Sequence, residues 1–379
     1  MTSPVKPRIL GALHGDISEA EASVKYGYFF NSLARKFDLI QVKDVHLHGA
    51  HRWKNLLLSF YPEKAKWQMR FYKFPGAFVD RSIAFGQYLR RNRNAFDMVL
   101  QVGVLFNASY DAPFIKNLIY TDYTSVLSAQ KPASGRSPFS GAELTRWIAL
   151  ERQAYEQADH VFTRSRLVQA SLIDDYGIAP AKVTVVGGGI NFPPLPPFPA
   201  GNLEFGVPTG LFIGREFYRK GGDVLLKAFA LARETYPDTH LLVVTRDEPA
   251  PDLPSENVHF IEYRWSRELL QSLYRMADYF VLPSRLETWG DVLLEAMAFG
   301  MPCIGTESDA MNEIILNKTN GCLVPVDNVD ALSQSILGMV TNPERLKRWG
   351  ENARCHVEEN FTWDSVVGRM SSTIYKTAS

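Results

Sequence analysis

The stretch YFVLPSRLETWGDVLLEAMAFG, residues 279–300, is the most informative part of this chain for its fold. It opens with an apolar run, Tyr279 to Leu282, which predicts a buried strand. After a polar loop the pattern becomes that of a helix from Asp291 to Phe299, which Gly300 closes. The stretch therefore predicts a strand, a loop and a helix in succession.

Two carboxylates flank the start of this predicted helix, Glu287 before it and Glu295 within it. Backbone N–H groups at a helix start, with the helix macrodipole behind them, suit an anion such as a diphosphate. Carboxylates accept hydrogen bonds from hydroxyls, so one on each side of the anion can hold two sugars. The alternative is that both are surface glutamates beside a turn.

Short apolar runs alternate with helical patterns along the chain. Strands that alternate with helices imply parallel sheets, as in doubly wound α/β domains. The earlier runs are Arg8–Leu13, Leu39–Val42, Met98–Val104, Leu118–Tyr120, His160–Thr163 and Val183–Val186. The later runs are Gly210–Ile213, His240–Thr245, Val258–Glu262, Tyr279–Leu282, Cys303–Thr306 and Cys322–Val324.

The length of the chain, 379 residues, exceeds the ~250–300 residues at which a single core stops growing, so two domains are expected. The proline-rich segment 187–201 can continue neither a strand nor a helix and is the expected linker. We therefore expect a first domain over 1–188, a linker over 189–202, a second domain over 203–360 and a helix over 361–379. Thr362 can cap that helix, whose apolar face is Trp363, Val366, Val367, Met370 and Ile374.

The composition is that of a packed globular protein, with 46% hydrophobic and 22% charged residues. No apolar run approaches the ~20 residues that a membrane-spanning helix needs, and the N-terminal sequence lacks the apolar core of a secretory signal. We therefore expect a cytoplasmic protein. Its three cysteines, Cys303, Cys322 and Cys355, are widely spaced and odd in number, which argues against a disulfide framework and against a zinc site.

One segment is strongly basic although the whole chain is neutral. Between His51 and Asn94 there are ten Lys or Arg and only two acidic residues. Apolar side chains recur there at helical spacing, and they are Trp53, Leu56, Leu57, Phe60, Trp67, Phe71, Phe74 and Phe78. A basic amphipathic helix can lie on an anionic membrane surface, so residues 51–94 are a candidate for peripheral contact with the inner face of a membrane. The alternative is an apolar stripe in the core with a solvated basic face.

A second loop of interest is LFIGREFYRKGGDVLLKAF, residues 211–229. It reads as a strand that ends at Gly214 and a helix that starts near Gly222. Glycines let the backbone approach a ligand closely, and Arg215 and Lys220 between them can neutralise a diphosphate. The spacing is that of neither a Walker loop nor a dinucleotide-binding fingerprint, so it is no ATP or NAD signature.

The two loops together resemble those of the retaining glycosyltransferases of family 4, which have the GT-B fold of two Rossmann-like domains facing a cleft. In that family a Gly-Arg, a short gap and a Lys-Gly bind the donor diphosphate, and an E-x-F/Y-G-x4-E element follows. Trp289 stands here where the family has Phe or Tyr. The resemblance implies a donor site formed by Gly214, Arg215, Lys220, Glu287, Thr288, Trp289, Gly290 and Glu295.

The resemblance also implies roles for the domains and for these residues. The first domain would hold the acceptor, the second would bind the nucleotide-sugar donor, and the helix over 361–379 would cross back to the first domain. Arg215 and Lys220 would hold the diphosphate, Glu287 the hydroxyls of the transferred sugar and Glu295 the ribose. The first domain departs from the family pattern, because a family His after the strand around 118–120 is replaced by Asp122. A carboxylate can accept a hydrogen bond from a sugar hydroxyl, so Asp122 joins Arg215, Lys220 and Glu287 as a catalytic candidate; the alternative is a loop residue that bonds nearby amides.

These features predict a retaining transferase that moves a hexose from a nucleotide diphosphate sugar to a hydroxyl of a glycan or lipid-linked acceptor, in cell-surface polysaccharide or glycolipid synthesis. Neither a cofactor nor a metal is expected, because no Asp-x-Asp pair occurs and the cluster His46, His48 and His51 is explained more simply by loop solvation than by metal ligation. No nucleic-acid partner is expected. The alternatives are a sugar-nucleotide hydrolase or epimerase of the same build, and a non-catalytic sugar-nucleotide-binding protein.

Overall fold

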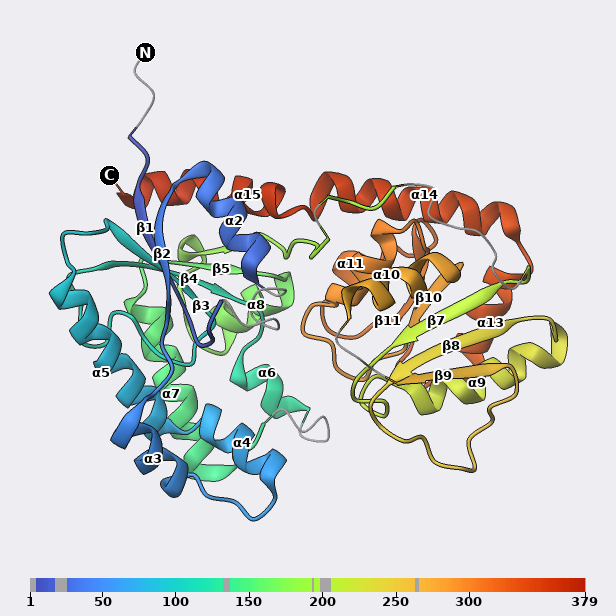
Figure 1. Cartoon of the computed structure of the whole chain (residues 1–379), viewed down its shortest axis with the longest axis horizontal. Helices are drawn as coiled ribbons and strands as arrows, with labels where there is room; N and C mark the ends of the chain where they lie inside the picture. The colour runs from blue at the N-terminus through green and yellow to red at the C-terminus, as the bar shows by residue number, and fades with distance from the viewer. Residues whose placement is uncertain are drawn as a thin grey trace. The chain divides into compact units, whose positions relative to one another are not determined.

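The computed structural model describes residues 5–17, 26–131, 137–192, 194–197, 206–262 and 266–378. The chain divides into two compact units, Met1–Gly187 with Trp363–Ser379, and Gly188–Thr362. Of the expected linker over 189–202, residue 193 and residues 198–202 lie outside the described residues. Each unit is an α/β structure built on a parallel sheet, one in the blue-to-green part of the chain and the other in the yellow-green to orange part (Figure 1).

The first unit contains a six-stranded sheet in the order β2-β1-β3-β4-β5-β6. Its strands are β1 (Arg8–Leu13), β2 (Asp38–Asp44), β3 (Met98–Val102), β4 (Lys116–Thr121), β5 (His160–Thr163) and β6 (Val183–Val185). Its helices are α2 (Tyr28–Lys36), α3 (Gly49–Leu58), α4 (Lys64–Tyr72), α5 (Pro75–Arg91), α6 (Ser125–Gln130), α7 (Gly141–Gln157), α8 (Arg166–Asp174), the short 3-10 helix η3 (Pro180–Lys182) and α15 (Trp363–Ala378).

The second unit contains a six-stranded sheet in the order β12-β11-β10-β7-β8-β9. Its strands are β7 (Thr209–Ile213), β8 (His240–Thr245), β9 (Val258–Glu262), β10 (Tyr279–Leu282), β11 (Cys303–Thr306) and β12 (Gly321–Val324). Its helices are α9 (Gly222–Thr235), α10 (Arg267–Met276), α11 (Asp291–Ala298), α12 (Met311–Ile314), α13 (Val329–Val340) and α14 (Pro343–Asn360).

Every apolar run that predicted a strand lies on a strand of the structure, which confirms the predicted α/β class. The central strands are covered by helices on both faces, so they read as continuous apolar runs. All residues of β3, β7 and β10, for example, are buried. The edge strand β9 is only partly buried, and its sequence is correspondingly more polar.

The last helix, α15, packs in the first unit. Its apolar face, Trp363, Val366, Val367, Met370 and Ile374, is buried in the same core cluster as residues of α2 and of the central strands. The Trp363 ring lies 5.3 Å from the ring of Phe29 on α2. The sequence therefore identified the buried face of this helix correctly.

Side chains cap the start of several helices. The side chains of Thr124, Ser165, Ser266, Asn328 and Asn342 accept hydrogen bonds from first-turn N–H groups of α6, α8, α10, α13 and α14. By contrast, α9 and α11 begin at glycines in the left-handed conformation, with no side-chain cap at that position. These two helices follow the two loops that the sequence singled out.

None of the helices in the described part of the chain combines the length and apolar character that crossing a membrane requires.

Candidate functional site

The two candidate loops follow neighbouring strands of the second sheet. β7 leads into residues 214–221 and β10 into residues 283–290, and β7 and β10 pair directly with each other. On one side of this pair the sheet continues through β8 and β9, and on the other through β11 and β12. In open α/β sheets, ligands bind at the carboxyl ends of strands where the strand order reverses in this way.

Hydrogen bonds join the two loops. The backbone N–H of Arg285 donates to the carbonyl oxygen of Arg219 at 3.0 Å. The guanidinium of Arg219 in turn donates from Nη1 to the carbonyl oxygen of Leu286 at 2.7 Å. Within the loop after β10, the hydroxyl of Ser284 donates to the same carbonyl at 2.8 Å. The loops therefore form one structural element, although the residues involved lie far apart in the sequence.

Lys220 and Glu287 form an ion pair between the loops. Their side chains are only 12% and 9% exposed. The backbone N–H of Glu287 donates to Oδ2 of Asp309 at 2.9 Å, which anchors the loop from the other side. The structure thus brings together the residue expected to hold the diphosphate and the residue expected to hold the transferred sugar. The sequence predicted both residues but not this pairing.

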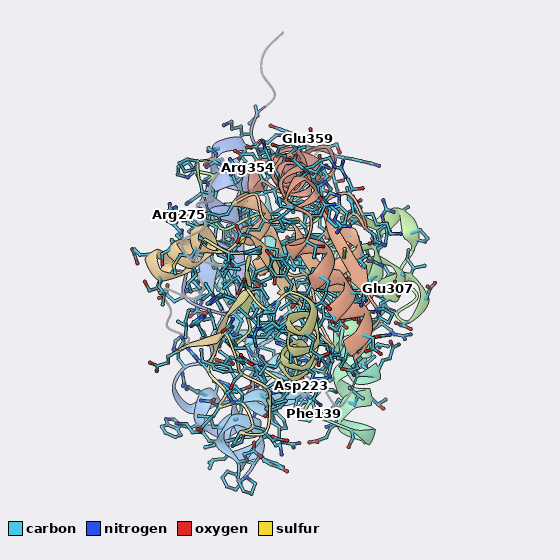
Figure 2. All side chains as sticks on the ribbon, turned by 90° about the vertical axis from the view of Figure 1, so that its right-hand side faces the viewer. Phe139, Asp223, Arg275, Glu307, Arg354 and Glu359 are labelled. Carbon is cyan, nitrogen blue, oxygen red and sulfur yellow. The ribbon has the colours of Figure 1, made fainter. Side chains whose placement is uncertain are left out.

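A second ion pair holds the loops from outside. Nη1 and Nη2 of Arg285 donate to the two carboxylate oxygens of Asp223, labelled in Figure 2, at 2.8 and 2.9 Å. Nε of Arg285 also lies 2.7 Å from Oδ1 of Asp327. Burial raises the pKa of Asp223, but the hydrogen bonds and charge of Arg285 outweigh it, so the net pKa is lowered. This pair fixes the start of α9 against the loop after β10.

Two glycines are required at the loop ends. Gly221 has φ +74°, and a Cβ atom there would overlap the carbonyl oxygen of Pro283. Gly290 has φ +103°, and a Cβ there would lie 2.9 Å from Cδ1 of Leu293. Both positions need a residue without a side chain, because L-residues rarely adopt this backbone conformation. Gly221 thus permits the two loops to approach each other, and the two glycines permit the chain to turn into α9 and α11.

Trp289 serves the core rather than the surface of the site. Its side chain is buried and its ring lies 5.9 Å from the ring of Phe361. Its Nε1 lies against Gly188, where a Cβ would come within 2.7 Å of it. The ring of Trp289 therefore packs in the core, and its role in donor binding stays a prediction. Thr288 beside it is half-buried.

The remaining predicted site residues occupy different surroundings. Arg215 is exposed directly after Gly214, which is buried at the carboxyl end of β7. Asp122 lies in the first unit, half-buried directly after β4. The roles of all these residues in donor binding and catalysis stay predictions.

Glu295 lies in α11, where Oε2 accepts a hydrogen bond from the hydroxyl of Tyr274 at 2.9 Å. Burial raises the pKa of this carboxyl to about 7, against the lowering effect of the Tyr274 hydroxyl. Its carboxylate form therefore predominates only above that pH.

This pKa predicts how donor affinity depends on pH. If Glu295 holds the ribose, the affinity for a nucleotide sugar should fall by up to about tenfold between pH 8 and pH 6, because the carboxyl takes up a proton in that range. Titration calorimetry across that range measures it. The Glu295→Gln variant should bind weakly at every pH, and an equal pH dependence in this variant would contradict the assignment.

Two functional candidates escaped the sequence analysis. Asp309 has φ +55°, and its Oδ2 accepts the hydrogen bond from the backbone N–H of Glu287 that holds this loop. His14 follows β1 at the carboxyl edge of the first sheet, with its ring 3.9 Å from that of His46. Burial and then the charge of Arg81 lower the pKa of His14 to about 3, so its imidazole is neutral near pH 7.

The three histidines that are clustered in the sequence, His46, His48 and His51, have different surroundings in the structure. Nδ1 of His46 lies 2.8 Å from Oδ1 of Asp44, and Nδ1 of His51 lies 3.4 Å from Oδ2 of Asp80. His48 is exposed at the start of α3. Within the described residues, no three His, Cys, Asp or Glu side chains are grouped so that they could hold a metal ion.

Comparison with known proteins finds relatives of this chain. Residues 202–356 match the family described as glycosyl transferases group 1, and this range contains both loops. Over 267 residues the chain is 26% identical to a glycogen synthase of Mycobacterium tuberculosis, which covers 68% of this chain and 62% of that protein. The chain thus spans about three-fifths of the length of this curated relative.

Solved structures with the same fold cover nearly the whole chain. Sucrose-phosphate synthase from Thermosynechococcus elongatus superimposes with a TM-score of 0.67 and 18% identity, over 98% of both chains. HepE of Anabaena, solved in complex with UDP-glucose, superimposes with a TM-score of 0.64 and 15% identity, over 98% of this chain and 100% of that one. The fold is that of GT-B glycosyltransferases. Together, the fold and the family match over the paired loops support a glycosyltransferase.

Proposed function

We propose that this protein is a retaining glycosyltransferase that moves a hexose from a nucleotide diphosphate sugar to a hydroxyl of a glycan or lipid-linked acceptor. The observation that carries the proposal is the joined pair of loops at the reversal of strand order, with the Lys220–Glu287 ion pair between them. The match of this region to glycosyl transferases group 1 supports it, and so does the likeness to HepE, which was solved with UDP-glucose.

The residues of the site suit the chemistry of sugar transfer. The acceptor hydroxyl oxygen bonds to the anomeric carbon on the face that the diphosphate leaves, and the bond from that carbon to the phosphate oxygen breaks. The departing phosphate oxygen takes the proton of the acceptor hydroxyl. Arg215 and Lys220 stabilise the charge that grows on this oxygen, an electrostatic contribution that the protein supplies itself. The nucleotide sugar is a co-substrate, and the proposed reaction uses no other cofactor.

In this proposal, Glu287 and the start of α11 bind different parts of the donor. The Glu287 carboxylate accepts hydrogen bonds from hydroxyls of the transferred sugar, which fixes its orientation. α11 begins at Gly290 without a side-chain cap, so its first-turn amides are placed for a phosphate. When a donor binds, its diphosphate competes with Glu287 for Lys220, so the ion pair exchanges one anionic partner for another.

We further propose that the protein acts in the cytoplasm at the inner face of a membrane, in cell-surface polysaccharide or glycolipid synthesis. The support is that part of the basic segment 51–94 has apolar side chains in solvent. Trp53, Leu57 and Phe60 are 68%, 72% and 62% exposed, whereas Phe78 is buried. An exposed apolar stripe beside basic residues is typical of interfacial helices.

The central test is consumption of a nucleotide sugar with and without an acceptor. A thermal-shift screen first selects the nucleotide sugar that stabilises the protein, because a ligand of the folded state raises its melting temperature. We expect release of the nucleoside diphosphate to require an added glycan or glycolipid, with the sugar recovered on that acceptor in the same anomeric configuration. Equal consumption without an acceptor would instead indicate a hydrolase, and binding without consumption a non-catalytic protein.

A further inference from the structure

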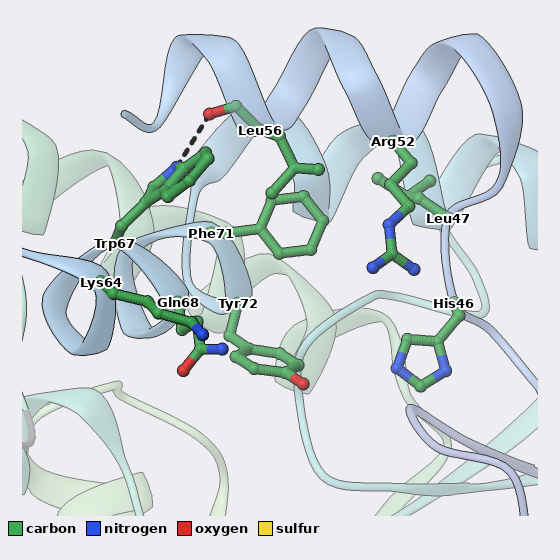
Figure 3. A pocket seen from close by; sticks show the side chains of 9 residues that line it. All are labelled: His46, Leu47, Arg52, Leu56, Lys64, Trp67, Gln68, Phe71 and Tyr72. Carbon is green, nitrogen blue, oxygen red and sulfur yellow. Dashed lines mark hydrogen bonds between the residues drawn. The ribbon is translucent and has the colours of Figure 1, made fainter. Parts of the chain in front are cut away.

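A cavity of about 230 Å³ opens in the first unit between α3, α4 and the segment after β2. We call it the α3–α4 pocket (Figure 3). Its lining residues are His46, Leu47, Arg52, Leu56, Lys64, Trp67, Gln68, Phe71 and Tyr72. Nε1 of Trp67 donates to the carbonyl oxygen of Leu56 at 2.9 Å, which ties the two helices together on one side of the cavity. The pocket thus has a fixed aromatic and aliphatic wall with polar groups at its rim.

The basic side chains of α3 and α4 fall into two groups. The members of the first group form ion pairs with carboxylates of the protein. They are Lys54 with Asp80, Lys66 with Glu63 and Arg70 with Glu143, at 3.3, 2.8 and 3.0 Å.

The second group is the two cations that line the pocket. Within the described residues, the side chains of Arg52 and Lys64 have neither an ion pair nor a hydrogen bond, and the lining includes no carboxylate. Figure 3 shows them entering from α3 and α4 respectively. Most of the positive charge of these helices is therefore balanced within the protein, and the charge that remains is at this cavity.

The pocket lies at the carboxyl edge of the first sheet. His46 lies two residues after the end of β2, and the centre of its ring is 3.9 Å from that of His14, which directly follows β1. Tyr72 reaches the same place, with its ring 5.1 Å from that of His14. Ligands of doubly wound sheets bind at this carboxyl edge. A molecule in the α3–α4 pocket would therefore reach the edge at which the first unit is expected to hold an acceptor.

Exposed apolar side chains lie next to the pocket. The ring of the exposed Phe60 lies 5.4 Å from the ring of Trp67, which lines the pocket. Trp53 and Leu57, also exposed, lie one helical turn apart on α3, the helix that carries Arg52 and Leu56. A cavity for an anion that borders an exposed apolar strip matches a molecule with an anionic head and an apolar tail. A free inorganic anion would use only the cavity, and a neutral detergent would use only the exposed apolar strip.

We propose that the α3–α4 pocket binds the phosphate group of an anionic lipid, with Arg52 and Lys64 on the phosphate oxygens and the hydrocarbon chain along Trp53, Leu57 and Phe60. As a statement about the acceptor, the inference rests on the proposed function: the sugar acceptor is then a phosphate-linked lipid rather than a free glycan. Binding itself requires no sugar transfer and is tested without a donor.

The test uses the full-length protein and titration calorimetry with three soluble probes: dihexanoyl phosphatidic acid, dihexanoyl phosphatidylcholine and inorganic phosphate. The double variant Arg52→Ala/Lys64→Ala removes the two pocket cations. The matched control is Arg91→Ala/Arg93→Ala, which removes two exposed cations of the same basic segment at the end of α5, near the amino ends of the strands. Melting curves check that both variants are folded.

We expect the wild type to bind phosphatidic acid at least about tenfold more tightly than either other probe, and the pocket variant to lose about tenfold or more in affinity, because it lacks both charge-assisted hydrogen bonds to the phosphate. The control variant should stay within about twofold of wild type, because its cations are distant from the pocket. Flotation with phosphatidylglycerol vesicles should show the same order.

Three results would overturn the inference. Equal affinity for phosphatidic acid and inorganic phosphate would show a site for free anions, and equal affinity for phosphatidylcholine would show apolar binding alone. Equal losses in the pocket and control variants would show diffuse attraction to a charged surface. The proposed function is tested separately from the lipid site. Lipid binding without sugar transfer would contradict the proposed function and support the lipid site. Sugar transfer to a soluble glycan without lipid binding would support the proposed function and contradict the lipid site.

Discussion

The Lys220→Ala variant should turn over its nucleotide sugar about 10²–10³ times more slowly than wild type, a loss typical of removing one group that stabilises transition-state charge. Lys220 is the cation between the two loops, and the proposed reaction places the growing negative charge of the leaving phosphate there. The measurement is the rate of nucleoside diphosphate release at saturating donor and acceptor. The control is Lys227→Ala, which removes an exposed lysine from α9 in the same unit.

Loss of activity must be separated from loss of stability in this variant. Without Lys220, the carboxylate of Glu287 would be left nearly buried and without its cation, which destabilises a protein. The double variant Lys220→Ala/Glu287→Gln removes that unbalanced charge. It should melt closer to wild type than the single variant while staying as inactive. Near-normal turnover in Lys220→Ala would end the assignment of this lysine to the phosphate.

The Gly221→Ala variant should destabilise the second unit by about 3–5 kcal/mol, in the range of substitutions that force both backbone strain and overlap. The residue has φ +74°, and the added methyl group would occupy the space of the Pro283 carbonyl oxygen. Backbone atoms cannot rotate away as a side chain can, so the loops must separate. Donor binding should be lost together with stability.

Gly206→Ala, also in the second unit, separates the two contributions. Gly206 has φ +66°, but nothing lies within 4 Å of the position of its Cβ. It should cost only about 1 kcal/mol, from the backbone conformation alone. Unfolding of the second unit can be followed in urea by the reaction of the buried Cys303 thiol, which reacts after the exposed Cys355. Equal effects of the two glycine substitutions would show that the loops tolerate separation.

The strands were predictable because of how the sheets are covered. A parallel strand with helices on both faces is a continuous apolar run, so MVLQV of β3 and YFVL of β10 stand out in the sequence. The switch from β10 to α11 was also visible, because Gly290 and Gly300 bracket a helical pattern. These features depend on residues that are neighbours in the sequence, so the sequence shows them directly.

The site was predictable in its parts but not in its contacts. Glu287 and Lys220 were identified, but their ion pair depends on β7 and β10 being neighbours, which the order of strands along the chain does not state. The position of Trp289 in the core depends on Gly188 and Phe361, which lie far from it in the sequence.

Burial of the basic segment could not be predicted from periodicity. Helical spacing identified one stripe that includes Trp53 and Phe78, but the structure exposes the first and buries the second. A stripe shows that one side of a helix is apolar, and it does not show whether another element covers that side. His14 was not identified either, because it is a single residue after a strand and the sequence around it forms no motif.

The hydrogen bonds between the loops connect residues 67 positions apart, as between Arg219 and Leu286. Contacts of such long sequence separation form late in folding, because closing the intervening chain costs entropy before the contacts repay it. A partly folded second unit therefore lacks the Lys220–Glu287 ion pair and, with it, the proposed position of the diphosphate. Bound nucleotide sugar should consequently protect the whole unit against proteolysis, which makes the donor a reporter of completed folding in a growing or refolding chain.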